Sequence, residues 1–163
     1  MRLHLARAVV VGLICLPLLA DVPEKPKYQL VLQAPPTTSV DSVAVSPDGS
    51  LAATAGGEGG VRLYNAKTGE LLRTIGEVVG DRDVVFSPDG RLLAAAGFHM
   101  DKIVGVYDVQ TGKGVLALEG QTEWEADATV FSPDGKLLAS TATDKQVLVW
   151  ELATGKLVHQ LKN

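Results

Sequence analysis

Cysteine is almost absent from this chain. The single cysteine, Cys15, lies in an apolar N-terminal stretch. No disulfide can therefore form within the chain, and the fold must depend on packing and hydrogen bonds. The chain also lacks a long basic run, and its formal net charge is −4. Binding to nucleic acid needs clustered Lys and Arg, so nucleic acid is not expected as a partner. After the first twenty residues, no segment shows the period of a helix.

Residues 1–20 have the layout of a secretory signal peptide. Basic residues come first (Arg2, His4 and Arg7), an apolar run follows over Ala8–Leu16, and small Ala20 stands before the expected cut. This pattern predicts an exported protein, periplasmic or extracellular, whose mature chain begins near Asp21. Lipidation at Cys15 is disfavoured, because bulky Leu13 and Ile14 precede the cysteine.

An uncleaved N-terminal membrane anchor is the alternative for the same segment. The apolar stretch from Ala8 to Ala20 contains Pro17, and it is shorter than the roughly 20 residues that a spanning helix needs. Cleavage is therefore the favoured interpretation, and the anchor stays as the alternative.

A three-fold repeat dominates the rest of the sequence. Ser-Pro-Asp-Gly occurs at Ser46–Gly49, Ser87–Gly90 and Ser132–Gly135. The following Thr-Gly pairs begin at Thr68, Thr111 and Thr154, 43 residues apart both times. A fixed period of about 40–45 residues that contains only short strands is typical of a β-propeller.

The repeat divides the chain into three parts. Residues 1–20 are the signal peptide, residues 21–39 are a linker with an N-terminal outer strand at Tyr28–Leu32, and residues 40–163 hold three repeats of four strands. In each repeat the second strand is nearly continuous and apolar, which predicts burial on both faces. These second strands are expected at Leu51–Thr54, Leu92–Ala95 and Leu137–Thr141.

These motifs resemble the WD-repeat (WD40) β-propeller family over about Tyr28–Asn163. The third repeat is nearest to the family pattern, with Phe131–Gly135 and then Val147–Trp150. The resemblance implies an all-β fold in which four strands form a blade and blades ring a central channel. Such rings have about 4 to 8 blades, so three repeats predict an incomplete ring.

The family's buried polar network is implied for the third repeat alone. Ser140, Asp144 and Trp150 match three of its members, while Gln121 stands where a His is usual. We therefore expect these three residues to have a structural role.

No catalytic, cofactor or metal site emerges from the sequence. Asp48, Asp89 and Asp134 occupy equivalent turns of separate repeats, which favours turn chemistry over a shared site. No pair of His residues has metal-ligand spacing, and Ser140 has no evident base that would activate it as a nucleophile. The sequence therefore predicts that the protein is not an enzyme.

One group of residues stands out as a candidate partner contact. Phe98, His99 and Met100 lie in a lengthened link of the second repeat, and Trp124 lies in the link into the third. In a propeller both links emerge on one face, where exposed Phe, Met and Trp are typical contact residues. Packing of Trp124 onto the neighbouring blade is the alternative.

The sequence therefore predicts an exported WD-repeat scaffold or interaction module that binds a protein or peptide. An exported propeller hydrolase of lactonase type is the alternative, and it would need metal-binding residues that converge on the channel. Both ends of a three-blade arc would expose strand edges or blade faces. These edges and faces would be covered if two chains associated into a six-blade assembly. They would also be covered if this chain were a fragment of a longer propeller.

Overall fold

The computed structural model describes residues 39–57, 60–76, 81–97, 104–118, 126–142 and 145–162. Within these ranges every regular element is a strand. The strands of blade 1 are β1 (Ser42–Val45), β2 (Leu51–Ala55), β3 (Val61–Asn65) and β4 (Leu71–Ile75). Those of blade 2 are β5 (Asp81–Phe86), β6 (Leu92–Gly97), β7 (Val104–Asp108) and β8 (Gly114–Leu118). Those of blade 3 are β9 (Ala126–Phe131), β10 (Leu137–Ala142), β11 (Gln146–Glu151) and β12 (Lys156–Lys162).

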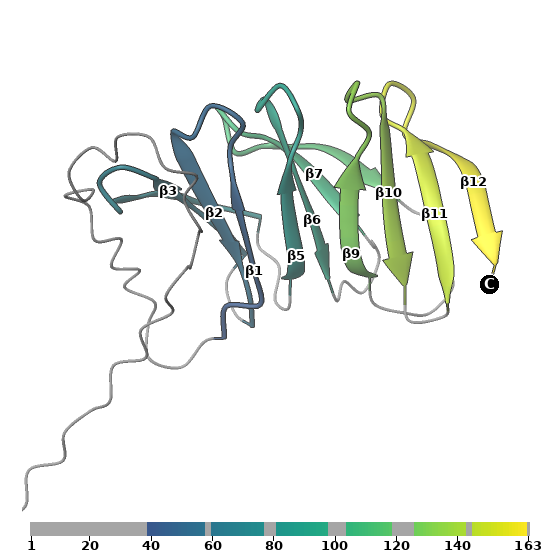
Figure 1. Cartoon of the computed structure of the whole chain (residues 1–163), viewed down its shortest axis with the longest axis horizontal. Helices are drawn as coiled ribbons and strands as arrows, with labels where there is room; N and C mark the ends of the chain where they lie inside the picture. Colours follow the sequence, from purple (N-terminus) through teal and green to yellow (C-terminus); the bar gives the residue numbers. More distant parts are fainter. Residues whose placement is uncertain are drawn as a thin grey trace, which may run out of the picture.

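Each blade is an antiparallel sheet whose strands are ordered as they follow in the chain. The three blades stand side by side, and their first strands, β1, β5 and β9, are neighbours (Figure 1). The predicted all-β fold of three four-strand repeats is confirmed. The arc of described blades does not close into a ring (Figure 1).

The Ser-Pro-Asp-Gly turn joins the first and second strands of each blade by the same bonds. In blade 1 the Gly49 N–H donates to the Ser46 carbonyl at 2.8 Å, and the Ser46 hydroxyl donates to Asp48 Oδ1 at 2.6 Å. The Ser50 N–H donates to the same carboxylate oxygen at 3.0 Å. The Ser46 and Ser50 donors lower the pKa of Asp48 from 3.8 to about 2, because they stabilise the ionised form.

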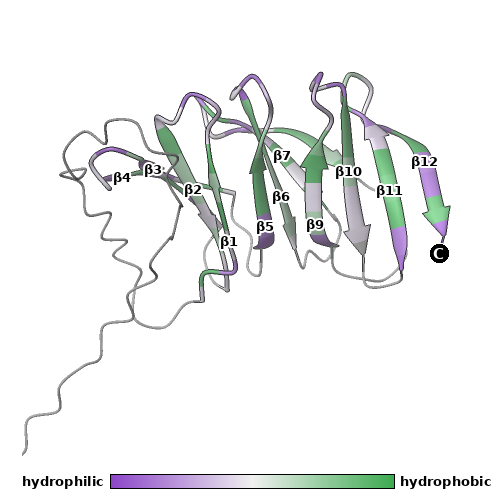
Figure 2. Cartoon of the chain, viewed as in Figure 1, coloured by the Kyte–Doolittle hydropathy of each residue, from purple (hydrophilic) through white to green (hydrophobic). Residues whose placement is uncertain are grey.

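Apolar side chains form two layers, one between each pair of neighbouring blades. Blades 1 and 2 enclose a cluster that includes Leu63, Ile75 and Leu93, and blades 2 and 3 enclose one that includes Val106 and Trp150. Trp150 and Leu93 are fully buried. Green stretches of the strands in Figure 2 mark the apolar residues that supply these layers. The blades therefore depend on each other for their cores.

The third repeat departs from the expected burial of its second strand. In β2 and β6 every residue after the first is buried, as predicted. In β10, Leu138 and Ser140 are buried, whereas Leu137 and Thr141 are exposed. The prediction of burial on both faces is wrong for β10, because no further described blade covers the second face of blade 3.

The predicted signal peptide at residues 1–20 and the outer strand at Tyr28–Leu32 lie outside the described residues. Within the described ranges, no helix has the length and apolar character needed to cross a bilayer.

Changing Asp48 to Asn should make the fold less stable at pH 7, because the amide accepts the Ser46 and Ser50 bonds less strongly than a carboxylate. The folded-state pKa of Asp48 is lowered, so its contribution is fully present above about pH 4 and disappears as the pH falls towards 2. Thermal midpoints measured by circular dichroism at pH 7, 4 and 2 should show the gap between the two proteins closing. A constant gap would contradict this account of the turn.

Changing Gly135 to Val should destabilise the fold by about 1–2 kcal/mol, since a β-branched residue is strained at positive φ. Gly135 has a φ of 70°, and a Cβ there would meet its nearest neighbour, Pro88, at an ordinary 3.8 Å. Backbone strain, rather than a clash, is therefore what the variant measures. Gly135→Asn is the control, because Asn tolerates this conformation. Equal urea midpoints for the Val and Asn variants would show that the strain is absent.

Candidate functional site

A carboxylate connects the first strands of all three blades. The Ser42 hydroxyl of β1 donates to Asp83 Oδ1 at 2.8 Å. On the other side, the Thr129 N–H and hydroxyl of β9 donate to Asp83 Oδ2 at 2.6 and 3.3 Å. Asp83 itself belongs to β5 in the middle blade. This partly buried bridge holds the inner strands in register with one another.

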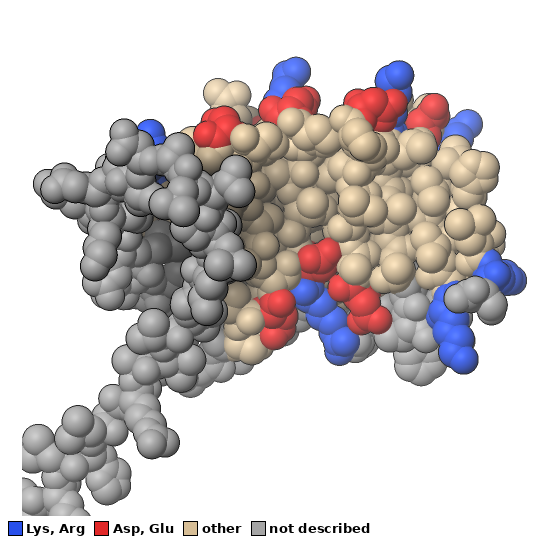
Figure 3. All heavy atoms as spheres, in the orientation of Figure 1, with Lys and Arg blue, Asp and Glu red and all other residues tan. Residues whose placement is uncertain are grey.

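Charges at the start of the same strands alternate in sign. Asp41 precedes β1, Arg82 lies in β5 and Asp127 lies in β9, at equivalent positions of the three repeats. Arg82 Nη1 lies 3.3 Å from Asp127 Oδ1. Figure 3 shows this charged row along one border of the inner-strand face and a second row along the opposite border, with uncharged surface between them.

The outward face of blade 3 is apolar and uncovered. Leu161 is 57% exposed, whereas its counterparts Leu118 and Ile75 in blades 2 and 1 are 0% and 1% exposed. Val130 is 58% exposed, whereas its counterpart Val85 packs against the core cluster between blades 2 and 3. In blades 1 and 2, these positions are therefore covered by the next blade along the chain.

Blade 1 has an open area at the opposite end of the arc. Val43 and Val45 of β1 are 63% and 59% exposed, whereas their counterparts Val84 and Phe86 are buried against blade 1. Farther out on blade 1, Tyr64 is buried. The open part of this blade is therefore its inner strand.

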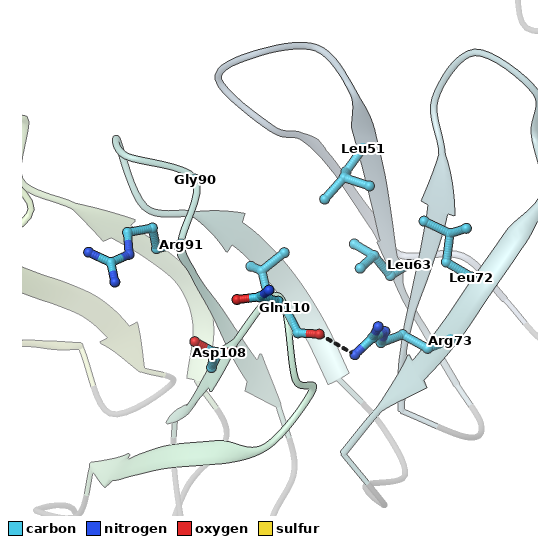
Figure 4. A pocket seen from close by; sticks show the side chains of 9 residues that line it. Leu51, Leu63, Leu72, Arg73, Gly90, Arg91, Asp108 and Gln110 are labelled. Atoms are coloured by element: carbon cyan, nitrogen blue, oxygen red, sulfur yellow. Dashed lines mark hydrogen bonds between the residues drawn. The ribbon is translucent and has the colours of Figure 1, made fainter.

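A groove of about 410 Å³ lies between blades 1 and 2. Blade 1 contributes Leu51, Leu63, Leu72 and Arg73, and blade 2 contributes Gly90, Arg91, Asp108, Val109 and Gln110. Figure 4 shows Arg73 reaching from blade 1 towards Gln110, with Leu51 and Leu63 on one side and Arg91 and Asp108 on the other. Arg73 Nη1 donates to the Gln110 carbonyl at 2.7 Å. The groove thus combines an apolar side with charged groups.

Asp108 is fixed within its own hairpin on the blade 2 side of this groove. The Thr111 hydroxyl and N–H both donate to Asp108 Oδ1 at 2.7 Å. These two bonds hold the pKa of Asp108 below its usual range, and the nearby Arg91 guanidinium lowers it further. Asp108 is therefore ionised at neutral pH.

Most of the predicted site residues cannot be compared with the described structure. Phe98, His99, Met100 and Trp124 lie outside the described residues, so their contact role stays a prediction. Ser140 and Trp150 are buried, while Asp144 lies outside the described residues. The Ser140 hydroxyl has no hydrogen-bond partner in the described part of the chain, and the polar network stays a prediction as well.

The carboxylates of the turns lie in three separate places, as their repeat positions suggest. Asp48, Asp89 and Asp134 each accept a bond from the Ser two residues earlier, at 2.6 Å in all three turns. Among the residues that the structure describes, no three His, Cys, Asp or Glu side chains gather in a way that could hold a metal ion.

Sequence reasoning missed both the Asp83 bridge and the groove. The repeat alignment contained a signal for each, because a charged residue breaks an otherwise neutral or apolar column. Asp83 aligns with Ser42 and Ala128, and Arg73 aligns with Leu116 and His159. Only the packing of the blades shows which side chains those two residues reach.

Comparison with known proteins gives a family match. The model of the WD40 family, described as WD domain, G-beta repeat, matches residues 26–65, 69–108 and 113–151. The matched segments are offset from the blades by one strand, since 69–108 contains β4 of blade 1 together with β5, β6 and β7 of blade 2. Each matched segment after the first therefore joins two neighbouring blades.

Three curated proteins illustrate the similarity. The chain is 41% identical over 76 residues to Eukaryotic translation initiation factor 3 subunit I of Coccidioides immitis, covering 45% of this chain and 22% of the relative. It is 34% identical over 92 residues to Small ribosomal subunit protein RACK1 of Glycine max, covering 55% and 27%. It is 39% identical over 115 residues to a Probable cytosolic Fe-S cluster assembly factor of Schizosaccharomyces japonicus, covering 68% and 18%. The chain thus spans less than a third of each relative.

These relatives contradict the predicted export. They are a translation initiation factor subunit, a protein of the small ribosomal subunit and a cytosolic assembly factor. None of these names describes an exported protein, so the prediction of a periplasmic or extracellular location is wrong. A charged N-terminal stretch followed by a short apolar run was too weak a pattern to establish it.

Changing Asp83 to Ala should destabilise the fold by about 1–3 kcal/mol, because the Thr129 N–H and the Ser42 hydroxyl lose their acceptor. Asp83→Asn keeps one carbonyl oxygen as an acceptor and should therefore lose less stability than Asp83→Ala. Asp127→Asn is the matched surface control, since an exposed ion pair contributes about 0–1 kcal/mol. Urea unfolding should rank the three variants in that order. Equal stability of Asp83→Ala and Asp127→Asn would refute the bridge.

Proposed function

The chain belongs to the WD40 family, and from this premise we propose that it is a non-enzymatic interaction module that binds a protein or peptide partner. The names of its relatives support this function, because they describe a factor subunit, a ribosomal protein and an assembly factor. The first two names describe parts of larger macromolecular assemblies.

The uncovered face of blade 3 is the observation that carries this proposal. Exposed apolar side chains that form one surface favour association, because burial removes them from water. On this face Val130, Leu137 and Leu161 are exposed. Their counterparts in blade 2 are buried or packed against the core cluster. The surface therefore has the composition of a blade–blade interface without its second half.

A second copy of the chain is the partner that this face fits best. Within the chain, the equivalent face of blade 2 is covered by the inner strand of blade 3 through Phe131, which belongs to the shared cluster. The corresponding inner strand of blade 1 exposes Val43 and Val45. Blade 3 of one copy would therefore seat on β1 of the other, and two such contacts would close a six-blade assembly.

Charge favours a protein over nucleic acid as the partner. The formal net charge of −4 would repel a phosphate backbone. The lactonase-type alternative gains no support, because the described part of the chain holds no group of metal-ligating side chains.

Sedimentation velocity over a range of concentrations tests the self-association. The wild-type chain should form a reversible dimer, and Val130→Ser combined with Leu161→Ser should weaken it by about tenfold or more, since a buried Val or Leu contributes about 1.5–3 kcal/mol. Added salt should strengthen the dimer, because Asp127 would come to lie beside Asp41 of the second copy and salt screens their repulsion.

Val115→Ser is the matched control for this experiment. Val115 is 49% exposed on β8 of the middle blade, away from both open ends of the arc. This variant should dimerise as the wild type does. A wild-type chain that stays monomeric at every concentration would overturn self-association through this face.

A further inference from the structure

We propose that the groove between blades 1 and 2 binds an apolar side chain that is followed by an acidic residue in a protein partner. The proposal deepens the interaction function proposed above and rests on it, but it concerns a different surface from the uncovered face of blade 3. It follows from three features of the groove: its size, its apolar side and the guanidinium of Arg73.

The groove has room for a large side chain. Its volume of about 410 Å³ falls within the range of roughly 300–1,000 Å³ that ligand sites occupy. Leu63 and Val109 line it and are 2% and 8% exposed, while Leu72 on its border is 45% exposed. An apolar side chain of the partner would bury Leu72 and fill a hollow between two blades, and both changes remove apolar surface from water.

Arg73 places a positive charge where the next blade has an apolar residue. Leu116 is the aligned residue of blade 2, and its Cδ2 lies 3.5 Å from the position that a Cβ of residue 155 would occupy in place of Gly155. In the same way, Arg73 Cδ lies 3.4 Å from the position that a Cβ would occupy at Gly112. The stem of Arg73 therefore packs on the neighbouring blade as Leu116 does. The guanidinium is an addition that this packing does not require.

The guanidinium of Arg73 is oriented but not saturated. Its bond to the Gln110 carbonyl, at 2.7 Å, uses one of its five N–H donors. Neither Arg73 nor Arg91 forms an ion pair with another described residue. A carboxylate of the partner can accept two parallel bonds from such a fork.

Asp108 explains why the preferred ligand carries both an apolar and an acidic group. Its ionised carboxylate beside Arg91 reduces the positive charge of the groove, so a simple anion gains little there. Because Asp108 is already bonded to Thr111 at 2.7 Å, it remains in its hairpin and leaves the space beside Arg73 open. Apolar contact must therefore supplement the charged contact.

Nuclear magnetic resonance with three capped hexapeptides tests the proposal on the full chain. The probe is Gly-Ser-Leu-Asp-Ser-Gly, and the two comparison peptides replace its Asp by Asn or its Leu by Ser. The Leu-Asp peptide should shift the backbone amides of Val109 and Gln110 and the Arg73 side-chain Nε–H. Each comparison peptide should bind about tenfold more weakly.

Arg73→Leu is the decisive variant, because the aligned Leu116 shows that the fold accepts Leu at this position. This variant should leave the thermal midpoint nearly unchanged. It should bind the Leu-Asp peptide about tenfold more weakly than the wild type does, and it should no longer prefer the Asp peptide over the Asn peptide. Leu72→Ser should weaken the binding of the Leu-Asp peptide and of the Leu-Asn peptide to the same extent. Lys156→Gln in blade 3 removes the same charge far from the groove and should bind as the wild type does.

Two outcomes would overturn the proposal. One is the absence of any shift at millimolar Leu-Asp peptide, and the other is an unchanged preference for Asp in Arg73→Leu. Self-association can fail independently, because the groove lies within one chain. A monomeric chain that binds the peptide would therefore support the groove while refuting the dimer.

Discussion

Apolar packing of one blade on the next is the interaction on which the rest of this structure depends. Each blade is one sheet thick, so its side chains point to two faces, and neither face has a core of its own. Blade 2 lies between two neighbours, and its second strand is buried after the first residue. In blade 3 the second strand alternates between buried and exposed residues. β2 of blade 1 is buried after its first residue as well, so β10 is the second strand that differs.

Polar contacts align the blades that this apolar packing holds together. Asp83 bonds to a strand on either side of it, and Arg73 crosses to the Gln110 carbonyl of the next blade. Both residues replace a neutral or apolar residue of the other repeats. One repeat can carry a different residue at such a position without a change in the other repeats, because the position lies at a boundary between blades. The boundaries are therefore where the three repeats differ in their polar contacts.

The repeat pattern predicted the strands closely. The second strand of blade 1 was expected at Leu51–Thr54 and is found at Leu51–Ala55, because a Ser-Pro-Asp-Gly turn precedes it and apolar residues define it. The three turn carboxylates were correctly assigned to the turns. The repeat alignment singles out Arg73, but it does not predict the groove, since the groove is formed by side chains from two repeats. The N-terminal pattern gave a wrong prediction of export, because a short apolar run does not by itself establish that a protein is secreted.

The sequence by itself determined the number of repeats, the strands within each and the turns between them. These features depend on contacts between residues near one another in the chain, such as the Ser46 hydroxyl and Asp48. Only the tertiary structure decided which faces are covered, that Asp83 joins three strands and that Arg73 borders a groove. Those properties depend on residues about forty positions apart that meet only when one blade packs on the next.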